Sequence, residues 1–193
     1  MDIQVNWVIK SLQNTFVKIF SNGSSFASGK YPEYLAKMLN ADLTNIAMPG
    51  YSNRSIWRTT LESKPVDYDL AVIQLTSKSR TEFFDRFWKE VSPQLCHPKL
   101  DDKKRLWEYW YENLYSDEYG DCEENFAIEG LRGYFACNNI SCIIVTTDKF
   151  TNSSKFDLNI FDINFPMDKT RHPTTIGHKI IANKIYEIAC NRM

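Results

Sequence analysis

Two adjacent serines, a histidine and an aspartate have the side-chain types and spacing for acyl-transfer chemistry. Ser24 and Ser25 lie in the small-residue segment 21–29, Ser-Asn-Gly-Ser-Ser-Phe-Ala-Ser-Gly, between the apolar run 16–20 and a helix-like run from Pro32. A buried strand, a tight turn and a helix in succession present a hydroxyl at the edge of a sheet. Segment 21–29 therefore predicts a nucleophilic serine, and these residues alone do not choose between Ser24 and Ser25.

His172 is the one of three histidines that is placed like an active-site base. It directly precedes Pro173 at the expected start of the last helix, whereas His97 lies in an irregular loop and His178 lies inside that helix. A helix N-terminus disfavours added positive charge, so an imidazole there stays neutral and can accept a proton near pH 7. A carboxylate must then orient the ring, and Asp168 is four residues upstream. The alternative is that His172 only caps its helix and Asp168 is a surface loop residue.

Alternating strand-like and helix-like segments are expected to position these groups. Strands are predicted at about 15–21, 43–48, 69–76 and 140–147. Helices are predicted near 32–40, 53–62, 81–91, 102–115 and 123–137, and from Pro173 onward, while residues 3–13 fit either a short helix or an edge segment. Run 69–76 is apolar on both faces, as a central parallel strand is. This order predicts an α/β protein with a parallel sheet covered by helices on both faces.

The carboxyl ends of parallel strands share one rim of the sheet, and ligands bind there. Residues that follow the four predicted strands are therefore expected to meet: Ser24 and Ser25, Pro49 and Gly50, Thr76 and Ser77, and residues 146–148. His172 would join them from the start of the last helix.

Length and composition indicate one soluble domain. The chain has 193 residues, 43% hydrophobic and 24% charged, with a net charge of −1, so nothing global attracts nucleic acid or an anionic membrane surface. We expect a single domain over 1–193, with a helical, aromatic-rich insertion near 96–138. Five cysteines without a CxxC pair predict buried thiols in a reducing cytoplasm, and the N-terminal residues lack a secretory signal or a membrane-spanning stretch.

No metal or cofactor is expected. The three histidines do not cluster with Cys or Asp at ligand spacings. The acidic segment 117–124 lacks the spacing and glycine of a calcium loop, which favours a solvated loop. Nucleotide binding is a third, weaker hypothesis, because Gly23 and Gly29 flank small residues but no Walker lysine-serine pair follows.

Four blocks in the right order resemble the SGNH (GDSL-type) hydrolases, particularly the compact single-domain forms of bacteria and their viruses. The blocks are Gly23-Ser24-Ser25-Phe26, the run 45–53 (Asn-Ile-Ala-Met-Pro-Gly-Tyr-Ser-Asn), Asp168, and His172-Pro173 with Gly177-His178. The resemblance spans nearly the whole chain. It implies a three-layer, flavodoxin-like fold and a Ser-His-Asp triad in which Ser25, not Ser24, is the nucleophile. It also implies that the Gly50 backbone N–H helps to hold the oxyanion, with Asn53 near enough to contribute a donor.

The sequence departs from the family pattern at three places. Ser24 stands where an aspartate is usual, and residues 75–78, Leu-Thr-Ser-Lys, replace the family's Gly-x-Asn-Asp and its oxyanion asparagine. Ser77, Asn53 or Arg80 are the candidate substitutes for that donor. The family spacing is Asp-x-x-His, whereas Asp168 lies one residue further from His172, and Asp162 is a less suitable orienting carboxylate.

The resemblance implies a serine-dependent ester hydrolase that acts on a small-molecule or glycan ester. Loss of an oxyanion donor costs roughly two to three orders of magnitude in rate. The departures therefore leave a second hypothesis open, a catalytically impaired SGNH-like binding or assembly protein.

Overall fold

The computed structural model describes residues 16–85, 87–91, 108–149 and 151–193. The expectations for residues 3–13, for the start of the helix at 102–115, and for Cys96 and His97 lie outside these ranges.

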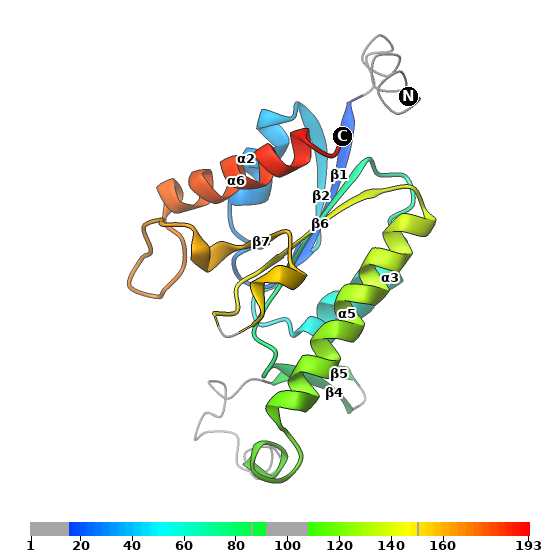
Figure 1. The fold of residues 1–193 in the computed structure, drawn as a ribbon, viewed down its shortest axis with the longest axis vertical. Coiled ribbons are helices and arrows are strands. Elements are labelled where there is room, and N and C mark those ends of the chain that lie inside the picture. Colours follow the sequence, from blue (N-terminus) through cyan, green and yellow to red (C-terminus); the bar gives the residue numbers. More distant parts are fainter. Residues whose placement is uncertain (1–15, 86, 92–107, 150) are drawn as a thin grey trace.

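A parallel five-stranded sheet forms the centre of the molecule (Figure 1). Its strands are β1 (Val17–Gly23), β2 (Ala41–Asn45), β3 (Leu70–Leu75), β6 (Ser141–Thr146) and β7 (Leu158–Asn159). They lie in the order β2-β1-β3-β6-β7, and each neighbouring pair is parallel. This is the flavodoxin-like, doubly wound order, in which the chain starts near the centre and moves to each edge in turn.

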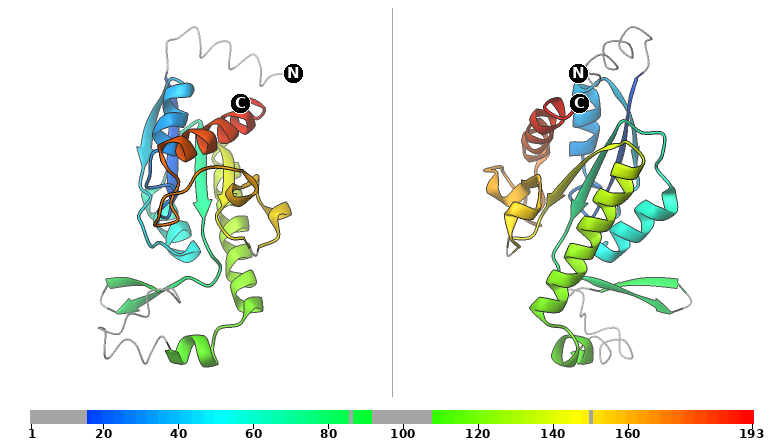
Figure 2. Two further views of the ribbon diagram at one scale, coloured as in Figure 1. Left: turned by 90° about the vertical axis from the view of Figure 1, so that its left-hand side faces the viewer. Right: turned by 45° about the vertical axis from the view of Figure 1, so that its right-hand side comes forward.

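Helices cover both faces of the sheet, which confirms the predicted three-layer α/β/α fold (Figures 1 and 2). Helices α2 (Tyr31–Met38) and α6 (Thr175–Cys190) pack on one face, and α3 (Asn53–Ser63) and α5 (Asp117–Cys137) pack on the other. Strand β3 serves both layers because its side chains alternate: Leu70 and Val72 join the α2–α6 core, whereas Ala71 and Ile73 join the α3–α5 core.

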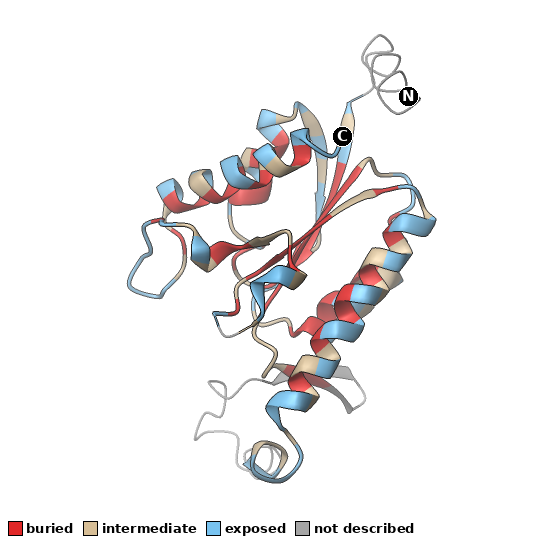
Figure 3. Ribbon diagram, in the orientation of Figure 1, coloured by how far each residue is buried: buried red, intermediate tan, exposed pale blue. Residues whose placement is uncertain are grey.

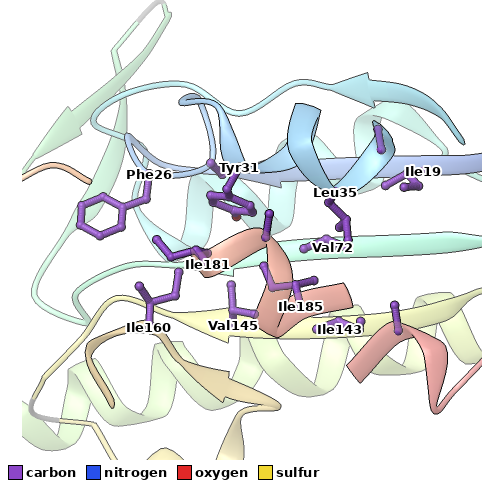
Figure 4. Close-up of a cluster of buried hydrophobic side chains, with 14 of the residues drawn as sticks. Ile19, Phe26, Tyr31, Leu35, Val72, Ile143, Val145, Ile160, Ile181 and Ile185 are labelled. Carbon is purple, nitrogen blue, oxygen red and sulfur yellow. The ribbon is translucent and has the colours of Figure 1, made fainter. Parts of the chain in front are cut away.

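Burial follows this layering. The central strands are buried, and each helix buries the side that faces the sheet while its outer side is exposed (Figure 3). In the α2–α6 core, Phe26 lies at the end of a cluster that includes Ile160 and Ile181 (Figure 4). The first turn after β1 is therefore attached directly to the core.

Segment 81–91 forms a β-hairpin, so the helix predicted there is wrong. Strands β4 (Thr81–Asp85) and β5 (Phe87–Val91) pair antiparallel, apart from the main sheet and near the start of α5 (Figure 2). The segment is rich in phenylalanine and tryptophan, which favour strands, and a short apolar run does not distinguish a strand from a helix.

The acidic segment 117–124 belongs to a helix and is not the expected solvated loop. Ser116 caps α5 by accepting a hydrogen bond from the Tyr119 N–H, so the helix begins at Asp117. Acidic side chains in a first helical turn interact favourably with the helix dipole. Helix α5 lies within the expected 96–138 insertion, and it contributes Ala127, Ile128, Leu131 and Phe135 to the core.

Smaller differences concern element ends and cysteines. Strand β2 begins at Ala41 and ends at Asn45, the last helix begins after a Thr174 cap, and the two-residue β7 was not predicted.

The described cysteines are free thiols. Cys122, Cys137 and Cys190 are exposed, so the expected burial is wrong for these three. No helix in the described ranges has both the length and the apolarity required to cross a bilayer.

Candidate active site

The turn 24–29, termed here the nucleophile turn, leaves the carboxyl end of β1 at the predicted rim. The Ser28 N–H donates to Ser24 O at 2.9 Å, and the Gly29 N–H donates to Phe26 O at 3.1 Å, which closes one helix-like turn. Ser24 is only 2% exposed, whereas Ser25 is half-buried and reaches the surface. Ser24 and Ser25, between which segment 21–29 alone did not choose, therefore differ in access, and Ser25 is the one at the surface.

A buried glutamine in β3 holds the nucleophile turn in place. Gln74 Oε1 accepts hydrogen bonds from the Ser24 and Ala27 N–H groups, both at 3.1 Å. Its Nε2 donates to Leu75 O at 2.7 Å and to Thr147 Oγ1 at 3.1 Å. One fully buried side chain thus links the ends of β1, β3 and β6.

Gln74 is a residue of the site that the sequence analysis missed. Its signal was a lone amide within the otherwise apolar strand Leu-Ala-Val-Ile-Gln-Leu. Buried polar groups need partners, so such a residue marks a contact across the sheet. The partner could not be read from the sequence, because Ser24 is fifty residues away.

Gly23 permits the close approach between the turn and β3. A Cβ at this position would lie 2.7 Å from Ala27 Cβ and 2.8 Å from Gln74 Cβ. Asn45, at the end of β2, fixes the other side of the turn because its Nδ2 donates to Ala27 O at 2.9 Å. Three strands therefore determine the backbone that carries Ser25.

His172 lies at the base of a tight loop before α6, the loop that projects at the left of Figure 1. Met167 and Pro173 form a β-bridge, and the Asp168 N–H donates to His172 O at 2.8 Å. At the tip, Arg171 has a positive φ of 62°. The loop 167–173 is thus a small hairpin held mainly by its own hydrogen bonds.

The structure brings His172 next to the nucleophile turn. Its ring centroid is 5.7 Å from that of Phe26, the residue after Ser25. No hydrogen bond between Ser25 Oγ and the His172 ring occurs among the described residues. Catalytic hydrogen bonds are often long or poorly aligned before substrate binds.

Asp168 does not contact the His172 ring directly. Its Oδ1 accepts hydrogen bonds from Thr170 Oγ1 at 2.6 Å, the Thr170 N–H at 2.8 Å and the His172 N–H at 3.1 Å. These bonds, that of the Thr170 hydroxyl above all, lower the pKa of the Asp168 carboxyl. Asp162, the other candidate, is exposed in the 3-10 helix η3 (Ile160–Asp162).

Three N–H groups at the rim have no hydrogen-bond acceptor among the described residues. Neither the Ser25 nor the Gly50 backbone N–H donates to another group within the described chain, and Gly50 has the left-handed φ of 94° that favours glycine. Asn53, the first residue of α3, is 3% exposed and its Oδ1 accepts from the Thr76 N–H at 2.7 Å. Its Nδ2 is buried and has no hydrogen-bond partner, so this amide retains a free donor.

The loop after β3 is held by the segment after β6 and by α5. The Lys78 N–H donates to Asp148 Oδ2 at 3.0 Å, and Lys78 Nζ pairs with Asp121 at 3.0 Å. Ser77 Oγ lies 2.9 Å from Ser79 Oγ, and the Arg80 N–H donates to Ser77 O. Of the three candidate substitutes for the missing asparagine, Asn53 is therefore the one with a buried, unused amide donor.

No model of a known protein family matches the sequence, and no curated protein sequence matches it either. Solved structures do match. The psychrotrophic esterase EstA from Pseudoalteromonas sp. superimposes with a TM-score of 0.50 at 10% identity, over 90% of this chain and 97% of that one. The chain has the SGNH-hydrolase fold.

Other solved structures with the SGNH fold match at lower scores. An acetyl xylan esterase, Est2A from Butyrivibrio proteoclasticus, has a TM-score of 0.44 at 15% identity, over 92% of this chain and 64% of that one. A candidate lipolytic protein of the G-D-S-L family from Desulfitobacterium hafniense has a TM-score of 0.44 at 12% identity, over 89% and 99%. At these identities the likeness concerns the SGNH fold and not the activity.

Proposed function

We propose that this SGNH-fold chain is a serine ester hydrolase that acts on a small acyl or O-acetyl ester, free or carried on a glycan. The observation that carries the proposal is the position of Ser25: an accessible hydroxyl on a core-held turn, with the His172 ring against the next residue. The structure of the esterase EstA, which has the same fold, was solved inhibited by monoethylphosphonate. A phosphonate reagent is therefore a suitable probe for this chain.

In the proposed reaction, Ser25 Oγ attacks the ester carbonyl carbon while His172 Nε2 takes the hydroxyl proton. The tetrahedral oxyanion would be held by the Ser25 and Gly50 N–H groups and by Asn53 Nδ2. The imidazolium then protonates the departing alkoxide, which leaves an acyl-Ser25 ester. Water, activated by the neutral His172, hydrolyses that ester and restores the serine.

Turnover of p-nitrophenyl acetate by the purified full chain tests this proposal. We expect Ser25→Ala and His172→Ala each to lower kcat/KM by at least about three orders of magnitude, because nucleophile and base act as a unit. Circular dichroism and the melting temperature check that both variants fold. Turnover that is unchanged in both variants would refute the assignment.

A non-catalytic binding or assembly role is the alternative. It is supported by Ser24 in place of an acidic residue and by the absence of a Ser25–His172 hydrogen bond within the described chain. A wild-type protein that neither hydrolyses p-nitrophenyl esters nor reacts with a fluorophosphonate would favour it.

A further inference from the structure

The loop 167–173 places a threonine hydroxyl between the carboxylate and the imidazole. Thr170 Oγ1 lies 2.6 Å from Asp168 Oδ1 and 3.0 Å from His172 Nδ1. Thr170 O lies 3.1 Å from the same ring nitrogen. The extra residue between Asp168 and His172 is therefore accompanied by a hydroxyl that fills the gap.

The hydrogen-bond inventory fixes the direction of these bonds. An ionised carboxylate only accepts, so the single Thr170 hydroxyl proton points to Asp168. A carbonyl oxygen also only accepts, so the contact between Thr170 O and Nδ1 is a hydrogen bond only when the ring nitrogen donates. Both contacts are satisfied when His172 Nδ1 carries the proton, which leaves Nε2 free to accept one.

We propose that Thr170 is a positioning residue that relays Asp168 to His172, so that the base is oriented by an Asp168–Thr170–His172 chain and not by a direct carboxylate contact. This inference rests on the proposed hydrolase function. The hydroxyl is polarised by the carboxylate, and it stabilises the imidazolium that forms when Ser25 loses its proton. Asp168 stays ionised throughout, and no proton passes to it.

Within the described chain, the hydrogen-bond contacts of the His172 ring are those with Thr170. From its own loop, His172 faces Asp168 through Thr170 and is preceded by Arg171. From α6 it faces His178, whose pKa is lowered by burial and then by the nearby His172. From the nucleophile turn it faces the uncharged ring of Phe26. A change at Thr170 should therefore alter the base without altering another charged partner.

Thr170→Val and Thr170→Ser in the full chain separate the relay from a packing role. For Thr170→Val we expect kcat/KM for p-nitrophenyl acetate to fall about 10- to 100-fold, since the ring keeps its carbonyl partner but loses the polarised hydroxyl. The acid limb of the pH profile should move to lower pH, because the imidazolium is less stabilised. Thr170→Ser should stay within about threefold of wild type with an unshifted profile. A Thr170→Val enzyme with the wild-type rate and profile would overturn the relay.

Thr174→Val is the matched control. It removes a hydroxyl from the residue that follows this loop, but Thr174 Oγ1 contacts Pro166 O and the Gly177 N–H and not the His172 ring. We expect a lower melting temperature from the lost helix cap and an unshifted pH profile. An equal shift in both Thr→Val variants would mean that general loosening of the loop, not the relay, controls the base.

Nitrogen NMR of the histidine rings tests the relay independently of activity. His172 can be assigned by loss of its signals in His172→Gln, since the chain has three histidines. We expect the neutral ring to carry its proton on Nδ1, with a proton shift that changes in Thr170→Val. A proton on Nε2 would overturn the relay even in an active enzyme. If wild type is inactive but the Nδ1 proton is present and sensitive to Thr170, the hydrolase proposal fails and the relay stands.

Discussion

The two halves of the candidate site are held in different ways. The nucleophile turn is attached to the core, where Gln74 and Asn45 bind its backbone from neighbouring strands and Gly23 lets it pack against β3. The loop 167–173 is exposed from Met167 to Arg171 and is held chiefly by its own bonds, centred on Asp168.

This difference separates stability from chemistry. A change in the supports of the turn removes buried hydrogen bonds, so it should lower both the free energy of unfolding and the rate. A change in the loop affects exposed groups, so it should lower the rate and leave the free energy of unfolding almost unchanged. The variants below test this contrast, from the largest expected effect to the smallest.

Gln74→Met should have the largest combined effect. The variant leaves the Ser24 and Ala27 N–H groups buried without an acceptor, which costs about 2–5 kcal/mol in the free energy of unfolding. Displacement of the turn by about 1 Å should lower kcat by roughly 100-fold. Urea unfolding and steady-state kinetics measure the two effects.

Ile73→Ala is the control for Gln74→Met. It lies one residue away on β3 but faces the α3–α5 core, and its cavity should cost a similar 2–5 kcal/mol, roughly. We expect its kcat to stay near wild type. Equal losses of kcat in both variants would show that Gln74 acts through stability alone.

Asn53→Asp should lower the rate strongly. The carboxylate still accepts from the Thr76 N–H and suits the N-terminus of α3, but it no longer donates and it repels an oxyanion. We expect kcat to fall about 100- to 1,000-fold with KM nearly unchanged, and the free energy of unfolding to fall as well, because the second carboxylate oxygen is buried without a partner. A wild-type kcat would remove Asn53 from the oxyanion site.

Asp168→Asn should affect the rate alone. The pKa of the exposed Asp168 carboxyl is lowered by its loop hydrogen bonds, so its small contribution to the free energy of unfolding is present above the ordinary pKa of 3.8 and is lost as pH falls through the lowered folded-state pKa. At pH 7 the variant lacks the charge that the relay needs, and we expect kcat/KM to fall roughly tenfold or more. Thermal unfolding should be almost unchanged, and a large loss of stability would contradict the picture of a self-held loop.

Glu124→Gln should change only the pH dependence of stability. Glu124 is fully buried on α5, and burial raises the pKa of its carboxyl; Thr151 Oγ1 donates to it at 2.6 Å. The contribution of Glu124 to the free energy of unfolding is therefore fully present below the ordinary pKa of 4.5, and it is lost as pH rises through the raised folded-state pKa. We expect the free energy of unfolding of the variant to rise relative to that of wild type between pH 4.5 and pH 8, measured by urea unfolding.

Glu123→Gln, a change at the partly exposed neighbour, is the control for Glu124 and should show no such gain. The same pH dependence in both variants would mean that burial of Glu124 is not its cause.

The sequence predicts the layered fold well because strand alternation and helix order are local patterns. The central strand predicted at 69–76 and the alternation of strands with helices both led to the sheet that the structure contains. The hairpin at 81–91 was missed because its aromatic run fits two periods. Strand β7 has two residues, too few for any pattern.

The candidate site could be located from the sequence but not assembled from it. The order of the predicted strands placed Ser25, Gly50 and His172 on one rim, and the family resemblance chose Ser25 over Ser24. The side chains that hold these residues in place make contacts that no local sequence pattern predicts. Gln74 reaches across the sheet, and Thr170 fills a gap made by one extra loop residue. The roles of these side chains in catalysis remain predictions.

Intact-protein mass spectrometry after treatment with a fluorophosphonate tests the central claim most directly. The account predicts one covalent adduct, located by peptide mapping on Ser25, absent in Ser25→Ala and formed far more slowly in His172→Ala. No adduct on the folded wild-type chain, or an adduct that persists in Ser25→Ala, would contradict it.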